Sequence, residues 1–151
     1  MTVTDPAGDP DLLQSVVATA HDRLDSLLTE AARATGTDTP GVARTLGADL
    51  VAELVGHLNA EAMVVRPEVG AVLGQSEQQQ MADESHLLSS LAATTSVLGE
   101  YDLLAGALAD HRQLVETLLG RLRDASGVTR MANLGYEYVH AAEAASQRHL
   151  T

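Results

Sequence analysis

The 151-residue sequence contains no cysteine, no lysine, no phenylalanine and no tryptophan. Without cysteine, the chain has no disulfide, no thiolate ligand for zinc and no cysteine nucleophile. Its three tyrosines bring the aromatic content to 2%, so surfaces on which nucleic-acid bases stack are essentially absent. Imidazole and carboxylate groups remain as the side chains best suited to hold a metal ion.

Positive charge is also scarce. The chain has 21 acidic residues against 9 basic residues, all nine of them arginine, which gives a formal net charge of −12. Such a charge repels the phosphates of nucleic acids and of anionic lipids. No segment approaches the roughly 18 apolar residues of a membrane span, and the first residues lack the basic and apolar parts of a signal peptide. We therefore expect a cytoplasmic protein that binds neither nucleic acid nor membrane.

The apolar residues recur at helical spacing between breaks that contain glycine or proline. A composition of 45% apolar and 20% charged residues indicates one globular domain. The pattern predicts helices over about 10–34, 40–66, 77–98, 101–124 and 129–149, and Pro67 is expected to end or kink the second. The predicted fold is all-α: an up-down-up-down four-helix bundle over 10–125, an additional C-terminal helix in 126–151, and a flexible tail over 1–9.

Each of the four predicted bundle helices carries one histidine near its middle: His21, His57, His86 and His111. Glu61 follows His57 one helical turn later on the same face. Residues at the middle of antiparallel helices meet at one level of a bundle, so these imidazoles and the carboxylate are predicted to converge. Such groups are costly to bury unless they are hydrogen-bonded or bound to a metal ion. A metal site and a set of hydrogen-bonded core residues are both open interpretations.

The fourth helix offers Glu116, five residues after His111, while Val115 occupies the position one turn away. Five residues of helix place Glu116 about 140° from the direction of His111. The two side chains can therefore bind one metal ion only if the helix is locally distorted or the Glu116 side chain extends far enough. Asp110 and Glu84 are nearby carboxylates that can replace it. Imidazole with carboxylate, in the absence of thiolate, suits iron, manganese, zinc or copper.

This arrangement resembles the hemerythrin family, in the HHE cation-binding branch found widely in bacteria. That family has a histidine on its first helix, His-x3-Glu on the second, one or two histidines on the third, and His-x3-Glu or His-x4-Asp on the fourth. The matching segments here are residues 20–28, 57–67, 83–88 and 109–116, within about residues 10–125. Ser90 departs from the family forms that have a second histidine on the third helix, and Val115 departs from His-x3-Glu.

The resemblance implies a non-heme di-iron centre, oxo-bridged, for which other divalent metals are alternatives. The ligands that it implies are His21, His57, Glu61, His86, His111 and Glu116. It also implies a small partner, a diatomic molecule or peroxide, which the protein binds or reacts with in sensing, storage or detoxification. We expect a monomer or a weak homodimer. Whether the protein is an enzyme, for example one that decomposes peroxide, stays open.

Two alternatives from other functional classes stay open. One is a metal-free helical interaction module in which Ser90 and Val115 mark a degenerate site. The other is an iron or zinc storage or sensor protein whose occupancy is the signal. A different alignment would use His140 and Glu143 on the fourth helix, but 54 residues would then separate the second and third histidines. That separation is too long for one short connection.

Overall fold

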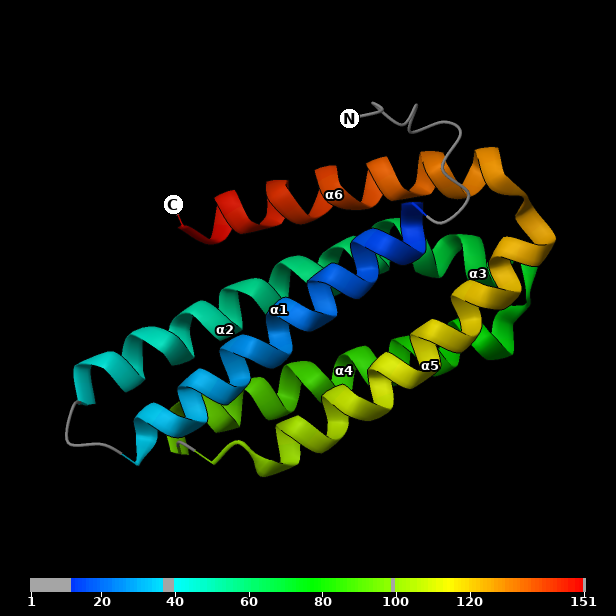
Figure 1. The fold of residues 1–151 in the computed structure, drawn as a ribbon. Helices are drawn as coiled ribbons and strands as arrows, with labels where there is room; N and C mark the ends of the chain where they lie inside the picture. The colour runs from blue at the N-terminus through cyan, green and yellow to red at the C-terminus, as the bar shows by residue number, and fades with distance from the viewer. Residues whose placement is uncertain (1–11, 37–39, 99, 151) are drawn as a thin grey trace.

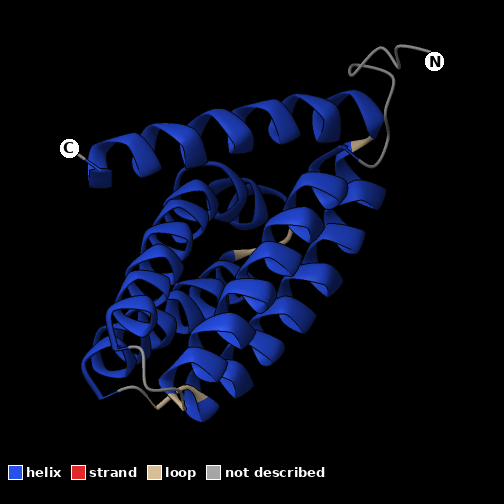
Figure 2. Cartoon of the chain, turned by 60° about the vertical axis from the view of Figure 1, so that its left-hand side comes forward, coloured by secondary structure: helices blue, strands red, loops and turns tan. Residues whose placement is uncertain are grey.

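The computed structural model describes residues 12–36, 40–98 and 100–150, and these residues form helices and no strand (Figures 1 and 2). The all-α prediction is therefore confirmed for this part of the chain. The predicted tail, the predicted first residue of the first helix and the predicted stop at Gly99 lie outside the described residues. The helices are α1 (Leu12–Thr35), α2 (Pro40–Ala60), α3 (Arg66–Val72), α4 (Gln75–Leu98), α5 (Asp102–Ser126) and α6 (Val128–Leu150), and a π-helical turn (Glu61–Val65) joins α2 to α3.

Helices α1, α2, α4 and α5 form the four-helix bundle, and successive members run in opposite directions (Figure 1). Helix α6 lies across α1 and α2, on the side of that pair that faces away from α4 and α5 (Figure 1). Gly74 and Gly127 supply the positive φ angles, 128° and 84°, that the turns before α4 and α6 require. None of the described helices combines the length and the apolar character needed to cross a membrane. The predicted bundle with an additional C-terminal helix is the architecture observed.

Pro67 does not end the second helix, in contrast to one of the two outcomes expected from the sequence. The helical backbone continues through the π-helical turn into α3, whose first turn contains Pro67. In this turn the Arg66 N–H donates to the Glu61 carbonyl five residues earlier. A proline ring crowds the carbonyl four residues before it, here that of Met63, and a wider turn at this place relieves that contact. The turn begins at Glu61, so the same distortion sets the direction of this side chain.

The apolar core has two parts, one toward each end of the bundle. One part includes Leu13, Val17, Val65, Val115, Leu119 and Leu134, and the other includes Leu24, Leu28, Leu54, Leu88, Leu104 and Leu108. A buried histidine stands between the two parts on each of three helices. His21 lies between Val17 and Leu24 on α1, and His57 and His111 hold the corresponding places on α2 and α5. The bundle therefore has a polar layer enclosed by apolar layers on both sides.

Helix α6 packs closely against α1 at Gly135. A Cβ atom at this glycine would lie 2.7 Å from the Leu12 Cγ and 3.0 Å from the backbone nitrogen of Leu13. We expect Gly135→Ala to lower the free energy of unfolding by about 1–3 kcal/mol, because the added methyl group must displace α6 from α1. Gly120→Ala is the matched control, since a Cβ there meets nothing within 4 Å, and it should raise stability by about 0.5–1 kcal/mol through helix propensity. Chemical denaturation followed by circular dichroism measures both; destabilisation by the two substitutions alike would contradict the packing at Gly135.

Candidate metal centre

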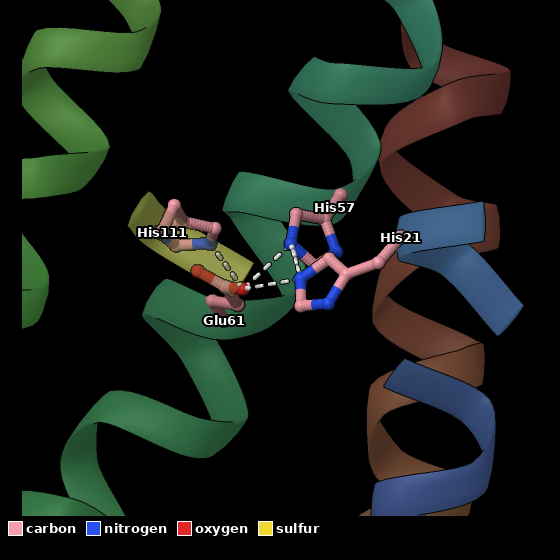
Figure 3. A group of neighbouring side chains, drawn as sticks. All are labelled: His21, His57, Glu61 and His111. Carbon is pink, nitrogen blue, oxygen red and sulfur yellow. Dashed lines mark hydrogen bonds and ion pairs between the residues drawn. The ribbon is translucent and has the colours of Figure 1, made fainter. Parts of the chain in front are cut away.

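The polar layer is a cluster of four residues: His21 from α1, His57 from α2, Glu61 from the π-helical turn and His111 from α5 (Figure 3). Each side chain is at most 3% exposed. One nitrogen or oxygen atom from each residue lies within 4.8 Å of the corresponding atoms of the other three. The structure thus brings together four of the six ligands implied by the sequence.

The Oε1 atom of Glu61 is the point on which the three imidazoles converge. The Nε2 atoms of His57, His111 and His21 lie 2.6, 2.9 and 3.9 Å from it. The Nε2 atoms of His21 and His57 are 3.1 Å apart. Figure 3 shows all four side chains directed toward one small region between the helices. The same nitrogen of each ring faces inward, so the three rings offer equivalent electron pairs to a shared point.

Hydrogen bonds leave some buried polar atoms of this cluster without a partner. An imidazole nitrogen either carries a proton and donates, or lacks one and accepts. If His57 Nε2 carries a proton, this one proton must serve both Glu61 Oε1 at 2.6 Å and His21 Nε2 at 3.1 Å. Among the described residues, neither His21 Nδ1 nor Glu61 Oε2 has a hydrogen-bond partner, although both atoms are buried. A metal ion accepts electron pairs from all three nitrogens at once and needs no proton between them.

The outward-facing nitrogens of two of the rings have partners of their own. His57 Nδ1 is hydrogen-bonded to the Tyr138 hydroxyl, which reaches the cluster from α6. His111 Nδ1 lies 3.5 Å from the Glu84 Oε2 of α4, an ion-pair distance at which the two atoms make no hydrogen bond. Such outer partners fix the ring orientation and the tautomer that leaves Nε2 free to bind a metal ion. With Nδ1 protonated, His57 donates to the tyrosine oxygen and presents the electron pair of Nε2 to the centre of the cluster.

The electrostatics of the cluster depend on its one fully buried carboxylate. Burial by itself raises the pKa of Glu61, but the neighbouring His57, His111 and His21 hold this pKa well below its ordinary value of 4.5. Burial lowers the pKa of His111, yet the hydrogen bond and negative charge of Glu61, together with the charge of Glu84, bring it above 6.5. The pKa of His21 falls below 6.5, chiefly because of burial. His111 has two carboxylates beside it, which explains why these two histidines shift in opposite directions.

Two of the six ligands that the resemblance implies, His86 and Glu116, lie outside the cluster. His86 is exposed on α4. Glu116 is 58% exposed on α5, where it accepts a hydrogen bond from Arg112. Val115 takes the inward position and is fully buried. The angle of about 140° between His111 and Glu116 on a regular helix accounts for the outward position of this carboxylate.

Helix α4 directs Glu84 rather than His86 toward the cluster. Met81 and Leu88, two helical turns apart, are the buried residues of α4 on either side of the polar layer. Glu84 lies between them on the same face, whereas His86 is rotated by about 200° from Glu84 at 100° per residue. Glu84 is one of the two carboxylates expected to be able to replace Glu116. The spacing of Met81 and Leu88 is the signal that would have selected it over His86.

Tyr138 contacts the cluster, although no pattern in the sequence indicates this. It belongs to the buried stripe of α6 with Met131, Leu134 and Ala141, and it is 3% exposed. A buried tyrosine hydroxyl nearly always needs a hydrogen-bond partner, and here the partner is a cluster histidine. Burial and the negative charges of Glu61 and Glu53 raise the pKa of Tyr138, so the hydroxyl stays protonated. The C-terminal helix is therefore part of the site.

The residues present fit a transition-metal ion. In a tetrahedral site with bonds of about 2.0–2.2 Å, the ligand atoms stand roughly 3.4 Å apart. Four of the six separations among the cluster atoms are 2.6, 2.9, 3.1 and 3.9 Å, which bracket that value, and all six are within 4.8 Å. Three imidazoles with one carboxylate form a donor set for iron, zinc, manganese or copper. His21, His57, Glu61 and His111 are the residues that can hold such an ion.

The metal-free protein should show a characteristic pH dependence that requires Glu61. The lowered pKa of Glu61 stabilises the fold above pH 4.5, and this contribution is lost as the pH falls through the folded-state pKa. The raised pKa of His111 stabilises the fold below pH 6.5, and this contribution is lost as the pH rises through its folded-state value. Glu61→Gln should therefore cost most between pH 4.5 and 6.5, about 2–4 kcal/mol.

Denaturation at a series of pH values measures this difference. Glu116→Gln is the matched control, because Glu116 is exposed and its ion pair with Arg112 contributes less than about 1 kcal/mol. A cost of Glu61→Gln that does not change with pH would contradict the pairing of Glu61 with His111.

Comparisons of the chain with protein-family models, with curated proteins and with solved structures found no match. No relative therefore assigns a role to the cluster. The four buried side chains, their outer partners and the helices that hold them are the basis for its function.

Proposed function

We propose that the protein binds one transition-metal ion through His21, His57, Glu61 and His111 and acts through that ion. The observation that carries the proposal is the approach of three Nε2 atoms to one carboxylate oxygen inside an apolar bundle. An uncompensated group of this kind would be expensive to bury, and metal coordination compensates all four side chains together.

One ion is favoured over two by the number of inward-facing donors. Among the described residues, four side chains converge, and His86 and Glu116 are exposed on the surfaces of α4 and α5. Glu84 approaches the opposite nitrogen of His111 and so supports that ring from outside. A di-iron centre of the kind implied by the hemerythrin resemblance needs more donors than these.

Iron is the metal that the hemerythrin resemblance favours, and the donor set is compatible with it. An iron ion held by His21, His57, Glu61 and His111 would supply a site for a small oxidant such as dioxygen, peroxide or nitric oxide. The chain itself supplies the surroundings. Apolar layers lie on both sides of the cluster, Tyr138 orients His57 through a hydrogen bond, and Glu84 places a carboxylate beside His111. We propose binding of such a small oxidant, in sensing, storage or detoxification, as the function of the iron form.

A second candidate is a zinc or iron sensor whose occupancy is the signal. The favouring observation is that all four donors are buried and come from the protein, as in closed zinc sites that do no chemistry. The two candidates differ in what happens when a small molecule is added. Nitric oxide should change the spectrum of the iron-loaded protein if the metal has a free position, and should leave it unchanged in a closed sensor.

Elemental analysis of the protein after anaerobic loading with iron tests the proposal. We expect one metal ion per chain in the wild type and in His86→Ala and Glu116→Ala, which change exposed residues. We expect loss of bound metal in His57→Ala and Glu61→Ala, together with loss of the rise in melting temperature that metal gives the wild type. Absence of metal from the loaded wild type would refute the proposal and favour the interaction module. Two ions per chain would refute the single-ion form and restore the di-iron expectation.

Tyr138→Phe should weaken metal binding without unfolding the protein. The substitution keeps the ring in the core and removes only the hydroxyl bonded to His57. Loss of such an outer partner typically lowers metal affinity by about 10- to 100-fold, while the hydrogen bond contributes about 1 kcal/mol to stability. Tyr136→Phe on the exposed side of α6 is the control. Metal titration measures both, and equal affinities for the two variants would show that Tyr138 does not support the centre.

A further inference from the structure

A cavity of about 190 Å³ opens between α1, α2 and α6. Small residues form much of its wall, and two buried polar side chains, His57 and Tyr138, also line it. The small wall residues are Ala20, Ala52, Gly56 and Ala142. Since His57 and Tyr138 are each 3% exposed, they form the inner end of the cavity. The cavity therefore leads from the surface to a member of the candidate metal centre.

The outer part of this cavity is acidic. Glu53 of α2 and Glu143 of α6 line it, and both are more accessible than His57 and Tyr138. Arg23 pairs with Glu53 through a hydrogen bond of 2.6 Å, whereas Glu143 is exposed. Carboxylates at the mouth of a cleft raise the local concentration of cations.

The opposite approach to the cluster, between α1 and α5, is closed by a cation. Arg112 crosses this gap and donates hydrogen bonds of 2.8 Å to Asp22 and to Asp25, both on α1. The space left beside His21 under this arginine is too small for a water molecule. Asp22, Asp25 and Glu116 offset the guanidinium charge. The lack of space is therefore what opposes passage of a metal ion on this side.

We propose that the cavity between α1, α2 and α6 is the route by which a hydrated divalent metal ion reaches the cluster. This inference rests on the proposed metal-binding function. The acidic outer part attracts the cation, and the small side chains leave space for its hydration shell. At the inner end, the Tyr138 hydroxyl and the His57 ring are polar groups that can replace bound water. His57 stands between the cavity and the other ligands, which makes its ring the point of passage.

The test uses Co²⁺ as the probe, because its visible absorption changes when histidine and carboxylate replace water. Ala52→Leu extends a larger side chain into the cavity, and Ala48→Leu, one turn earlier on the exposed surface of α2, is the matched control. An entry route determines the free-energy barrier to metal binding and release but not the equilibrium constant. Capture and release of Co²⁺ should therefore both slow by about tenfold or more in Ala52→Leu. The Kd should stay within about twofold of the wild-type value. Ala48→Leu should change neither rate.

A second pair of variants tests the charge and does not depend on how Ala52→Leu folds. Glu143→Gln removes a carboxylate from the cavity, whereas Glu137→Gln removes one from the other side of the same helix. Capture of Co²⁺ at low salt should slow about threefold in Glu143→Gln and remain unchanged in Glu137→Gln, and the difference should shrink at high salt.

Two results would overturn the proposed route while leaving the metal site intact. The first is a capture rate equal to that of the wild type in both Ala52→Leu and Glu143→Gln. The second is a changed Kd with an unchanged capture rate in Ala52→Leu, because that substitution would then act on the site. Failure of the wild type to bind Co²⁺ at equilibrium is a different result, and it would refute the proposed function itself.

Discussion

The structure depends on the convergence of three imidazole nitrogens on the Oε1 atom of Glu61 in the middle of an apolar bundle. This interaction divides the core into two apolar parts and fixes the level at which α1, α2 and α5 meet. Groups of this polarity are retained in a core only when their partners compensate the loss of water. Here the protein supplies one carboxylate oxygen for three rings, so compensation by the protein alone is incomplete. A metal ion bound by these side chains would supply the missing compensation.

The C-terminal helix contacts the same cluster. Helix α6 covers α1 and α2 and brings the Tyr138 hydroxyl to the outer nitrogen of His57. The same helix forms one wall of the cavity that ends at this pair. The opposite side of the cluster is tied by Arg112, which holds α5 against α1. The centre is thus supported from two sides, and the side with α6 has a cavity that reaches His57.

Much of the fold follows from the sequence, because apolar residues at helical spacing and breaks at glycine or proline are local signals. The positions of His21, His57, Glu61 and His111 on the core stripes likewise predict their convergence. His86 lies outside the cluster because the buried face of α4 is set by Met81 and Leu88 and not by the residue type found in the other helices. Pro67 predicts an end or a kink in its helix, but a proline alone does not distinguish these outcomes from a continuation through a wider turn, which is what the structure has. The contact of Tyr138 with His57 could not be predicted, because it depends on the packing of α6 on α1 and α2, which is a tertiary property.

The most direct test of the account is a crystal structure of the metal-loaded protein with anomalous diffraction at the absorption edge of the metal. The account predicts one anomalous peak per chain, within about 2.0–2.2 Å of the Nε2 atoms of His21, His57 and His111 and of a Glu61 carboxylate oxygen. Two peaks, a peak held by other residues, or no peak at saturating metal would contradict it.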